Sequence, residues 1–367
     1  MKPEVLLITS IYPPQVGGPA VFTSRFSKWL NKNNFKVKVI TYTSDFAIRD
    51  DKTSYVTLRE SRLVAFFKFI IEILKNSNRN TLILSNGAFI ETYIACLISR
   101  RKYVSKIPGD HVWELSRNRG WTSKNIEDFQ YEKLNFLQKI FRTFSNLSFK
   151  KAKIVISPSN QLAKFAERWG VNNEKIEIIY NCVNPDQFNV IDAPDKCYDL
   201  ITICRLVPWK GLEELVECVI KLDLKLLIVG DGPLLSKLES IAYKNPANIS
   251  LVGIIENNKL SEVLNSAKIF VLNSEFEATS YALIEAKMCG LPVIAKKTDG
   301  SQTLIQNGID GFVYSPLDGI GLEGAITELI ENQGLIDLFG SEARKDALLR
   351  FNEQINFSQI LELMETQ

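Results

Sequence analysis

The chain has 367 residues, of which 46% are apolar, and its 44 Lys and Arg nearly balance its 42 Asp and Glu to give a net charge of +2. This length and apolar content favour two globular domains with buried cores. Six cysteines without paired metal-ligand spacing and a single histidine argue against a disulfide framework and a multi-histidine metal centre. We therefore expect buried thiols and a chemistry that needs no metal.

Two apolar segments bear on targeting. Residues 1–14 contain only a four-residue apolar run, which is too short for the apolar region of a signal peptide. Residues 63–74 are the most apolar helix candidate, but Lys68 and Glu72 interrupt them, and they fall short of the roughly 20 residues that span a bilayer. The sequence therefore predicts a cytoplasmic protein without a transmembrane segment.

Charge is divided unevenly along the chain. Residues 1–182 carry 29 Lys and Arg against 15 Asp and Glu, a balance of +14, and the remainder carries 15 against 27, a balance of −12. A basic half is attracted to anionic lipid headgroups, to a phosphate-bearing acceptor or to nucleic acid, and charge alone does not choose among them. Since the sequence contains no recognised nucleic-acid reader motif, we expect no nucleic-acid partner.

In the first half, short apolar runs alternate with helical patterns, which is typical of parallel strands covered by crossover helices. The predicted strands are residues 5–10, 36–41, 81–86, 102–107 and 153–158. Residues 133–153 mix Phe and Leu with basic residues and contain no acidic residue. They form either a helix that lies on an anionic membrane or a core-packing helix with a basic outer face, and both fit the spacing.

The second half repeats this alternation. Its predicted strands are residues 199–204, 225–231, 249–253, 268–273 and 291–297, with helices at 211–222, 260–267 and 280–288. Two prolines and several turn-forming residues interrupt the periodicity at 184–199, so we expect residues 1–185 to form the first domain and 186–349 the second. The predicted fold is α/β, with two doubly wound, Rossmann-like parallel sheets. Because ligands bind beyond the carboxyl ends of such strands, we expect both sets of loops to face a central cleft.

Two loops of the first domain are candidate ligand contacts. Gly17 and Gly18 follow the first strand and precede an amphipathic helix, where glycine lets backbone approach a ligand, although a glycine pair also suits an ordinary turn. Asp110 and His111 follow the strand at 102–107. Either one contacts the ligand, or Asp110 caps a helix and His111 is an incidental surface residue.

Two basic residues open the second domain. Arg205 and Lys210 lie five residues apart just after the strand at 199–204, where both could neutralise an anionic ligand. Basic residues in a surface loop are also commonplace. Gly230 and Gly253 end the next two strands, and their loops either contact a ligand through the backbone or are simply turns.

The most informative stretch is residues 273–300, which contain two glutamates eight positions apart around a predicted helix start near Ser280. Glu277 is expected in the loop and Glu285 on the helix. Eight helical positions rotate a side chain by about 80°, so the two carboxylates are expected to hold different parts of one ligand. The alternative is a solvated loop and an exposed helix turn.

The helix predicted at 280–288 is expected to bury one side and to have unpaired backbone N–H groups in its first turn. Leu283, Ile284 and Met288 are predicted to pack into the core. The backbone N–H groups of residues 279–282, which include Thr279 and Tyr281, suit phosphate oxygens.

Together these segments resemble the signature of retaining family 4 glycosyltransferases, and the resemblance is strongest over residues 203–313. Where family members often have Glu-Gly-Phe-Gly, this chain has Glu277, Ala278, Thr279 and Ser280. The resemblance implies the GT-B fold. It also implies that the C-terminal helix, expected at 350–367, packs back on the first domain.

The resemblance further implies a role for each candidate. Glu277 would contact the hydroxyls of the donor sugar, Glu285 the ribose, and Arg205 with Lys210 the donor phosphates. Asp110 or His111 would lie near the reacting sugar. The remaining donor contacts would come from Gly17, Gly18, Gly230, Gly253, Thr279, Ser280 and Tyr281.

The expected function is transfer of a sugar, with retention of configuration, from a UDP- or GDP-sugar to an acceptor hydroxyl. The acceptor would be a saccharide or lipid-linked saccharide in cell-surface polysaccharide or glycolipid assembly, with peripheral contact to an anionic membrane. No side-chain nucleophile, metal or other cofactor is expected. Two alternatives stay open: a nucleotide-sugar epimerase or hydrolase of the same fold, and a catalytically silent nucleotide-sugar-binding subunit.

Overall fold

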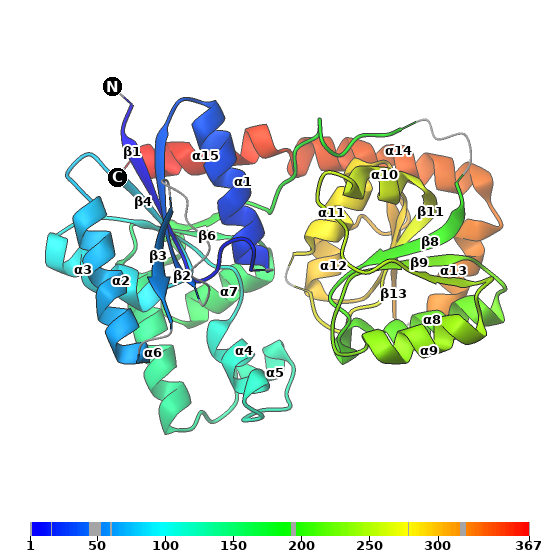
Figure 1. The fold of residues 1–367 in the computed structure, drawn as a ribbon, viewed down its shortest axis with the longest axis horizontal. Helices are drawn as coiled ribbons and strands as arrows, with labels where there is room; N and C mark the ends of the chain where they lie inside the picture. Colours follow the sequence, from blue (N-terminus) through cyan, green and yellow to red (C-terminus); the bar gives the residue numbers. More distant parts are fainter. Residues whose placement is uncertain are drawn as a thin grey trace. The chain divides into compact units, whose positions relative to one another are not determined.

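The computed structural model describes residues 2–15, 17–43, 53–58, 61–191, 196–277, 279–315 and 321–366. The chain forms two compact units (Figure 1). The N-terminal unit contains residues 1–179 and 357–367, and the C-terminal unit contains residues 180–356. Each unit is an α/β structure built on one parallel sheet.

The N-terminal sheet has seven strands. They are β1 (Glu4–Thr9), β2 (Lys36–Thr43), β3 (Thr53–Thr57), β4 (Leu82–Asn86), β5 (Val104–Lys106), β6 (Ile154–Ser157) and β7 (Ile176–Ile178). Their order is β3-β2-β1-β4-β5-β6-β7, and every pair is parallel. Val5 to Ile8 of β1 are fully buried, because helices on both faces of a parallel sheet leave no solvent face.

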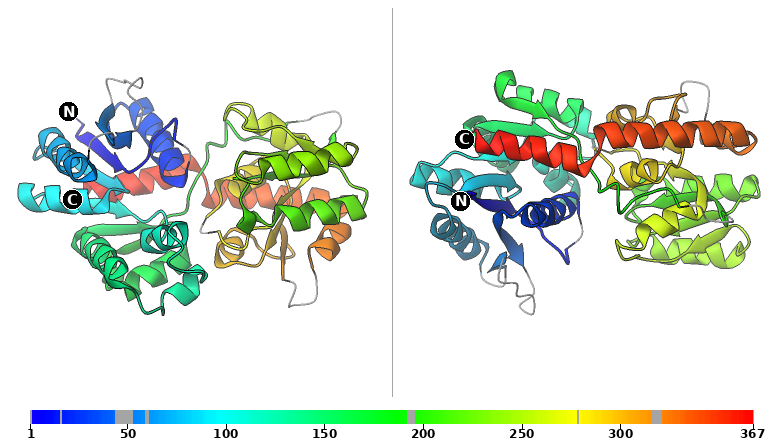
Figure 2. Two further views of the ribbon diagram at one scale, coloured as in Figure 1. Left: turned by 60° about the horizontal axis from the view of Figure 1, so that its bottom comes forward. Right: turned by 90° about the horizontal axis from the view of Figure 1, so that it is seen from above.

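Helices cover this sheet. They are α1 (Gly18–Lys32), α2 (Arg62–Asn76), α3 (Phe89–Ser99), α4 (His111–Asn118), α5 (Ile126–Phe129), α6 (Phe136–Lys151) and α7 (Asn160–Arg168). Most of α15 (Glu353–Glu365) also belongs to this unit, as Figures 1 and 2 show at the red end of the chain. Its Phe357 is buried against the rings of Phe22, Phe26 and Trp29 of α1, with centroids 4.9 to 5.9 Å apart.

The C-terminal sheet has six strands. They are β8 (Tyr198–Ile203), β9 (Leu226–Val229), β10 (Ile249–Leu251), β11 (Ala267–Leu272), β12 (Val293–Lys296) and β13 (Gly311–Tyr314). Their order is β10-β9-β8-β11-β12-β13, again with parallel pairs throughout. A buried apolar cluster lies on each face of this sheet, with Phe270 in one cluster and Ile269 in the other.

The helices of the C-terminal unit connect these strands and follow the last one. They are α8 (Leu212–Lys221), α9 (Leu235–Lys244), α10 (Leu260–Asn265), α11 (Tyr281–Met288), α12 (Asp299–Leu304), α13 (Leu322–Ile330) and α14 (Gln333–Arg350). Among the helices of the described residues, none is both long enough and apolar enough to cross a bilayer.

The predicted fold class is confirmed, and so are all ten predicted strands. The sequence prediction missed three strands, β3, β7 and β13, which have five, three and four residues. Each of them lies at an edge of its sheet, where burial is weaker and the apolar signal is correspondingly short.

Candidate donor site

The order of the C-terminal strands marks a point where the chain changes direction across the sheet. From β8 the chain moves through β9 to β10 at one edge, and it then returns to β11 and moves through β12 to β13 at the other. The loops after β8 and β11 therefore start side by side, and the chain then runs from them toward opposite edges of the sheet. In open parallel sheets, ligands bind beyond the carboxyl ends of the strands at such a point.

Backbone and side-chain hydrogen bonds fix these two loops to each other. The backbone N–H of Glu275 donates to the carbonyl of Trp209 at 2.9 Å, and Asn273 Nδ2 donates to the carbonyl of Gly211 at 2.8 Å. Asn273 is buried, and its Oδ1 accepts a hydrogen bond from the Tyr314 hydroxyl. Gly211 has a φ of +60°, and a Cβ there would lie 2.5 Å from the carbonyl oxygen of Asn273, so only glycine fits.

Two of the predicted site residues meet at this junction. Lys210 ends the short 3-10 turn η2 (Pro208–Lys210), and its Nζ forms an ion pair with Oε1 of Glu277. Both side chains are largely withdrawn from solvent, with 14% and 15% of their surfaces exposed. Ser274 Oγ also donates to Glu277 Oε1 at 3.3 Å. As predicted, Glu277 lies in a loop.

Arg205 lies on the same loop as Lys210, directly after β8. Its side chain is exposed and makes no hydrogen bond or ion pair with the described residues, so its guanidinium is available to an anion. Next to it, the pKa of the Cys204 thiol is raised to about 11, chiefly by burial, while Lys210 lowers it and Glu277 raises it. A thiol with this pKa is protonated at neutral pH and is a poor nucleophile.

Helix α11 carries the second glutamate. Ser280 caps the helix by accepting a hydrogen bond from the backbone N–H of Leu283 at 3.3 Å. Leu283, Ile284 and Met288 are fully buried, as predicted. Glu285 is also buried, with 4% of its surface exposed, so the alternative of an exposed helix turn is wrong for this residue. Burying a carboxylate is costly, and such positions are retained mainly where the charge is used or paired.

The start of this helix also contains Thr279 and Tyr281. Thr279 is half-buried, and its carbonyl accepts a hydrogen bond from Asn181 Nδ2 at 3.4 Å. Tyr281 is the first helical residue and packs against the core. The structure therefore places the predicted phosphate-contacting segment at the amino end of a buried helix.

The loops at Gly230 and Gly253 differ in how much space a side chain would have. Gly230 follows β9 with a φ of +144°, and a Cβ there would lie 1.9 Å from the carbonyl oxygen of Cys204, so packing alone requires glycine. Its backbone N–H donates to the carbonyl of Gly253 at 2.8 Å. A Cβ at Gly253 would meet no atom within 4 Å, which leaves open space beside this loop.

A buried charge network that sequence reasoning missed anchors α11. Lys287 is fully buried, and its Nζ donates to Asp310 Oδ2 at 2.8 Å, to Asp346 Oδ2 at 2.5 Å and to the carbonyl of Leu304 at 2.6 Å. Arg350 makes two hydrogen bonds of 2.6 Å to Asp346. The network joins the helix that carries Glu285 to the turn before β13 and to α14.

The N-terminal sheet has its own change of direction, between β1 and β4. Gly17 is the N-cap of α1 and Gly18 its first residue, and the cap position provides no side-chain hydrogen bond. Asn86, at the end of β4, holds the start of α1 by donating to the carbonyl of Pro19 and to Thr23 Oγ1, both at 3.2 Å. The two glycines thus lie at the carboxyl edge of the N-terminal sheet, at a helix start without a side-chain cap.

Asp110 is a helix cap. It is buried, and its Oδ1 accepts from the backbone N–H groups of Val112 and Trp113 at 3.0 and 3.1 Å. Its Oδ2 accepts from Arg142 at 2.7 Å and from Gln130 at 2.9 Å. The structure thus shows the capping arrangement that was one of the two alternatives for this residue, and His111, the first residue of α4, is exposed.

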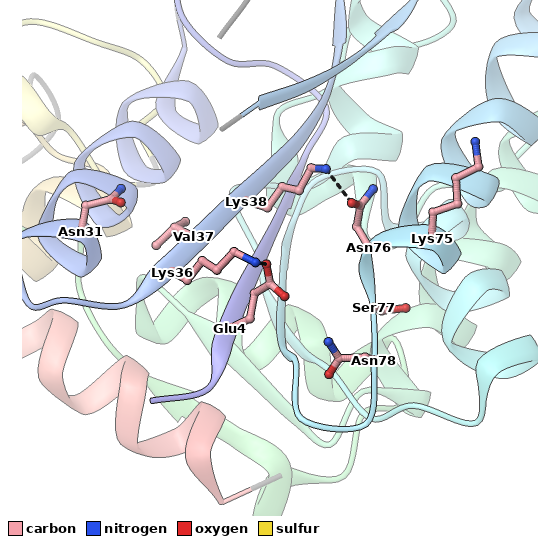
Figure 3. A pocket seen from close by; sticks show the side chains of 9 residues that line it. All are labelled: Glu4, Asn31, Lys36, Val37, Lys38, Lys75, Asn76, Ser77 and Asn78. Atoms are coloured by element: carbon pink, nitrogen blue, oxygen red, sulfur yellow. Dashed lines mark hydrogen bonds and ion pairs between the residues drawn. The ribbon is translucent and has the colours of Figure 1, made fainter. Parts of the chain in front are cut away.

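The larger of the hollows described for this chain, about 470 Å³, lies away from all these residues. Figure 3 shows its lining, in which Lys36 pairs with Glu4 at 2.9 Å and Lys38 donates to Asn76 at 2.6 Å. Glu4 and Lys36 begin their strands, so the hollow lies at the amino edge of the N-terminal sheet and is no part of the candidate site. Among the described residues, no group of three or more Cys, His, Asp and Glu side chains is placed to hold a metal ion.

Comparison with solved structures defines the class of the protein. The structure of HepE from Anabaena in complex with UDP and glucose matches over the whole of both chains, with a TM-score of 0.78 and 18% identity. The shared architecture of two Rossmann-like parallel-sheet domains is the GT-B fold.

Sequence comparison then gives the family. Residues 183–346 match the model of the family described as glycosyl transferases group 1, and residues 16–187 match that of glycosyltransferase family 4. An uncharacterized glycosyltransferase of Methanocaldococcus jannaschii is 22% identical, with 99% of this chain and 98% of that protein covered. The N,N'-diacetylbacillosaminyl-diphospho-undecaprenol alpha-1,3-N-acetylgalactosaminyltransferase of Campylobacter jejuni is 25% identical over 64% of this chain and 65% of its own. The chain is a GT-B glycosyltransferase with a group 1 C-terminal part and an N-terminal part of the family 4 kind.

Proposed function

We propose that this glycosyltransferase transfers a sugar from a UDP- or GDP-sugar to an acceptor hydroxyl with retention of the anomeric configuration. The observation that carries the proposal is the meeting of Lys210 and Glu277 where β8 and β11 diverge, with Arg205 exposed on the same loop as Lys210. A nucleotide-sugar donor is supported by HepE of Anabaena, whose structures are described as complexes with UDP and with UDP-glucose.

The charges of these residues suggest a division of labour. Arg205 and Lys210 would neutralise the diphosphate as the glycosidic bond breaks, since fixed cations stabilise charge that develops in the transition state. Glu277 would orient the sugar hydroxyls, and Glu285 the ribose. The helix start at Gly17 and Gly18 and the segment at Thr279 to Tyr281 would offer backbone N–H groups to phosphate oxygens.

The ion pair between Lys210 and Glu277 would have to open when the donor binds. In the structure each charge neutralises the other. A diphosphate that reaches Lys210 competes with Glu277 for the ammonium group, and the carboxylate is then released to accept hydrogen bonds from the sugar. The cation and the carboxylate would therefore change partners together when the donor binds.

Retention needs no protein nucleophile in this proposal. The acceptor hydroxyl attacks on the face that the diphosphate leaves, a new bond forms from its oxygen to the anomeric carbon, and a donor phosphate oxygen takes the proton. The neutral thiol of Cys204, with its pKa of about 11, supports a route that bypasses cysteine. We also propose that transfer needs no metal, because Lys210 and Arg205 can supply the positive charge.

The proposed acceptor is a saccharide or lipid-linked saccharide in cell-surface polysaccharide or glycolipid assembly. The Campylobacter jejuni relative is named for a diphospho-undecaprenol acceptor, which supports this class. The balance of +14 over residues 1–182 supports contact with an anionic membrane at its inner face.

The test is a donor panel with a lipid-linked saccharide acceptor, in which nucleotide release is followed and the anomeric configuration of the product is read by NMR. We expect acceptor-dependent release, a retained configuration, full rate in EDTA and loss of transfer in Glu285→Gln. An inverted product would refute retention. Equal nucleotide release without acceptor would indicate a hydrolase, and conversion of the donor to an epimer without acceptor would indicate an epimerase. Donor binding without turnover would indicate a silent subunit.

A further inference from the structure

Helix α2 exposes an apolar stripe on the side away from its sheet. Leu63, Phe67 and Ile71 recur every four residues and so lie above one another, and 66% of Leu63 and 55% of Phe67 are exposed. The opposite side of the same helix buries Ala65, Phe69 and Ile73. The helix is therefore apolar on two sides, of which the fold covers only one.

Helix α6 repeats this pattern. Phe136, Ile140 and Phe144 recur every four residues and are exposed, with 77% of Phe136 open to solvent, whereas Ser145, Ser148 and Phe149 face inward. The sequence left open a membrane-bound helix and a core-packing helix with a basic outer face. The structure shows that α6 packs inward and that its outer face carries apolar residues as well as lysines.

Helix α3 packs against both of these helices. It exposes Leu97 and Ile98 near its end. The exposed faces of α2, α3 and α6 form what we term the three-helix surface. It carries ten exposed large apolar residues: Leu63, Val64, Phe67, Ile71, Leu97, Ile98, Phe136, Leu137, Ile140 and Phe144.

Cations accompany these apolar residues. Lys68 and Lys75 are exposed on α2, where Lys75 pairs with Glu72 at 3.3 Å, and Lys139 is exposed on α6. Helix α3 is followed directly by the basic run at residues 100–102. Helix α6 contains no acidic residue. Ten exposed large apolar residues on three helices that pack in sequence are more than scattered surface residues, and large exposed apolar patches mark interaction sites.

We propose that the three-helix surface rests on a bilayer that contains anionic lipids. Apolar side chains on helices that lie along an interface enter the boundary between headgroups and acyl chains, while Lys and Arg reach the lipid phosphates. The combination of aromatic and aliphatic residues with cations fits this occupant better than a protein partner, because the apolar residues are spread over three helices and α6 carries cations without any acidic residue. This inference assigns the membrane contact proposed above to one surface, and it holds whether or not the donor site acts as proposed.

The test is sedimentation of the full chain with vesicles of phosphatidylglycerol and phosphatidylcholine, compared with vesicles of phosphatidylcholine alone. We expect binding only when the anionic lipid is present. The variant Phe67→Ser with Phe136→Ser should lose at least tenfold in partitioning. The variant Lys139→Gln should lose about fivefold, because it removes one cation from α6.

The matched control is Tyr243→Ser with Leu349→Ser, which removes two exposed apolar side chains from the C-terminal unit and should bind as the wild type does. All four apolar positions are exposed, so circular dichroism should show native folding in both variants. Absence of wild-type binding, equal binding to neutral vesicles, or equal losses in variant and control would each overturn the proposal. The assay uses no donor, so its failure would leave the proposed sugar transfer intact.

Discussion

The two units share an architecture but differ in what their loops and helices expose. Each is built on a parallel sheet whose first strand lies in the interior. Successive strands are added first toward one edge of the sheet and then toward the other. In the C-terminal unit, the loops at that point are bonded to each other and hold Lys210 against Glu277. In the N-terminal unit, Asp110 is used as a helix cap, and the distinctive feature is the three-helix surface. The two proposals thus use different units: donor chemistry is proposed for the C-terminal loops, and membrane contact is proposed for the helices of the N-terminal unit.

The largest expected effect tests whether the chemistry depends on the C-terminal loops. Lys210→Ala should lower kcat/KM by about 10³-fold, because one fixed charge at a transition state contributes that order of rate. The matched control is Lys237→Ala, whose side chain forms an exposed ion pair with Glu213 in the same unit and should change little. Wild-type turnover of a nucleotide sugar by the Lys210→Ala variant would contradict the proposal that the chemistry depends on the C-terminal loops.

The next effect concerns the buried charge network around Lys287 of α11. Lys287→Met leaves Asp310 and Asp346 buried without their ammonium partner, so unfolding free energy should fall by about 3 kcal/mol or more. Urea denaturation measures this loss. The control is Lys345→Met on α14, whose partner Glu342 is partly exposed, and an equal loss in both variants would contradict the role of the buried network.

A third prediction sharpens the role of Asp110 in the N-terminal unit. If Asp110 acts only as a cap and as the partner of Arg142, then Asp110→Asn and Arg142→Gln should each cost about 1 to 3 kcal/mol of stability and should lower kcat by similar, small factors. Activity assays at temperatures where both variants are folded separate the two roles. A kcat that falls 100-fold in Asp110→Asn alone would restore Asp110 as a contact of the reacting sugar.

A fourth prediction concerns the bond between the two C-terminal loops. Asn273→Ala removes the hydrogen bonds to Gly211 and from Tyr314, so Lys210 should lose its fixed position and kcat should fall about tenfold. Asn248→Ala is the control, since Asn248 bonds Asp223 and Leu224 at the opposite edge of the same sheet. Equal kcat values in the two variants would show that the loop bond does not matter.

The smallest effect tests the exchange of partners at Lys210. Glu277→Gln should weaken transfer but strengthen binding of UDP or GDP alone by about fivefold, because the ammonium group no longer has a competing carboxylate. Titration calorimetry measures the affinity. Glu275→Gln, an exposed neighbour in the same loop, removes the same charge without touching Lys210. Unchanged nucleotide affinity in Glu277→Gln would rule out the competition.

Much of the fold could be predicted from the sequence, because runs such as residues 5–10 and 268–273 carry a strong apolar signal that parallel strands require. The strand of residues 176–178 could not, since three residues with a central Glu give no pattern. Glu277 in a loop and the buried side of α11 followed from local periodicity. The pairing of Glu277 with Lys210 did not, because 67 residues separate them and only the adjacency of β8 and β11 brings them together.

The buried lysine shows a different limit. Lys287 lies in a helix whose whole circumference from Leu283 to Met288 is buried, so the spacing of apolar residues gave no sign of its position. Its partners come from residues 304, 310 and 346, and no local signal connects them. Networks of this kind depend on tertiary contacts that a single sequence does not reveal.

The contact of Phe357 with α1 has a consequence for how the protein is made. The first sheet begins with Glu4, yet its helical cover is incomplete until residue 357 has emerged from the ribosome. During translation, the N-terminal unit therefore stays incomplete while the C-terminal unit is synthesised. The aromatic face of α1 remains accessible to chaperones until α15 has been synthesised and packs against it.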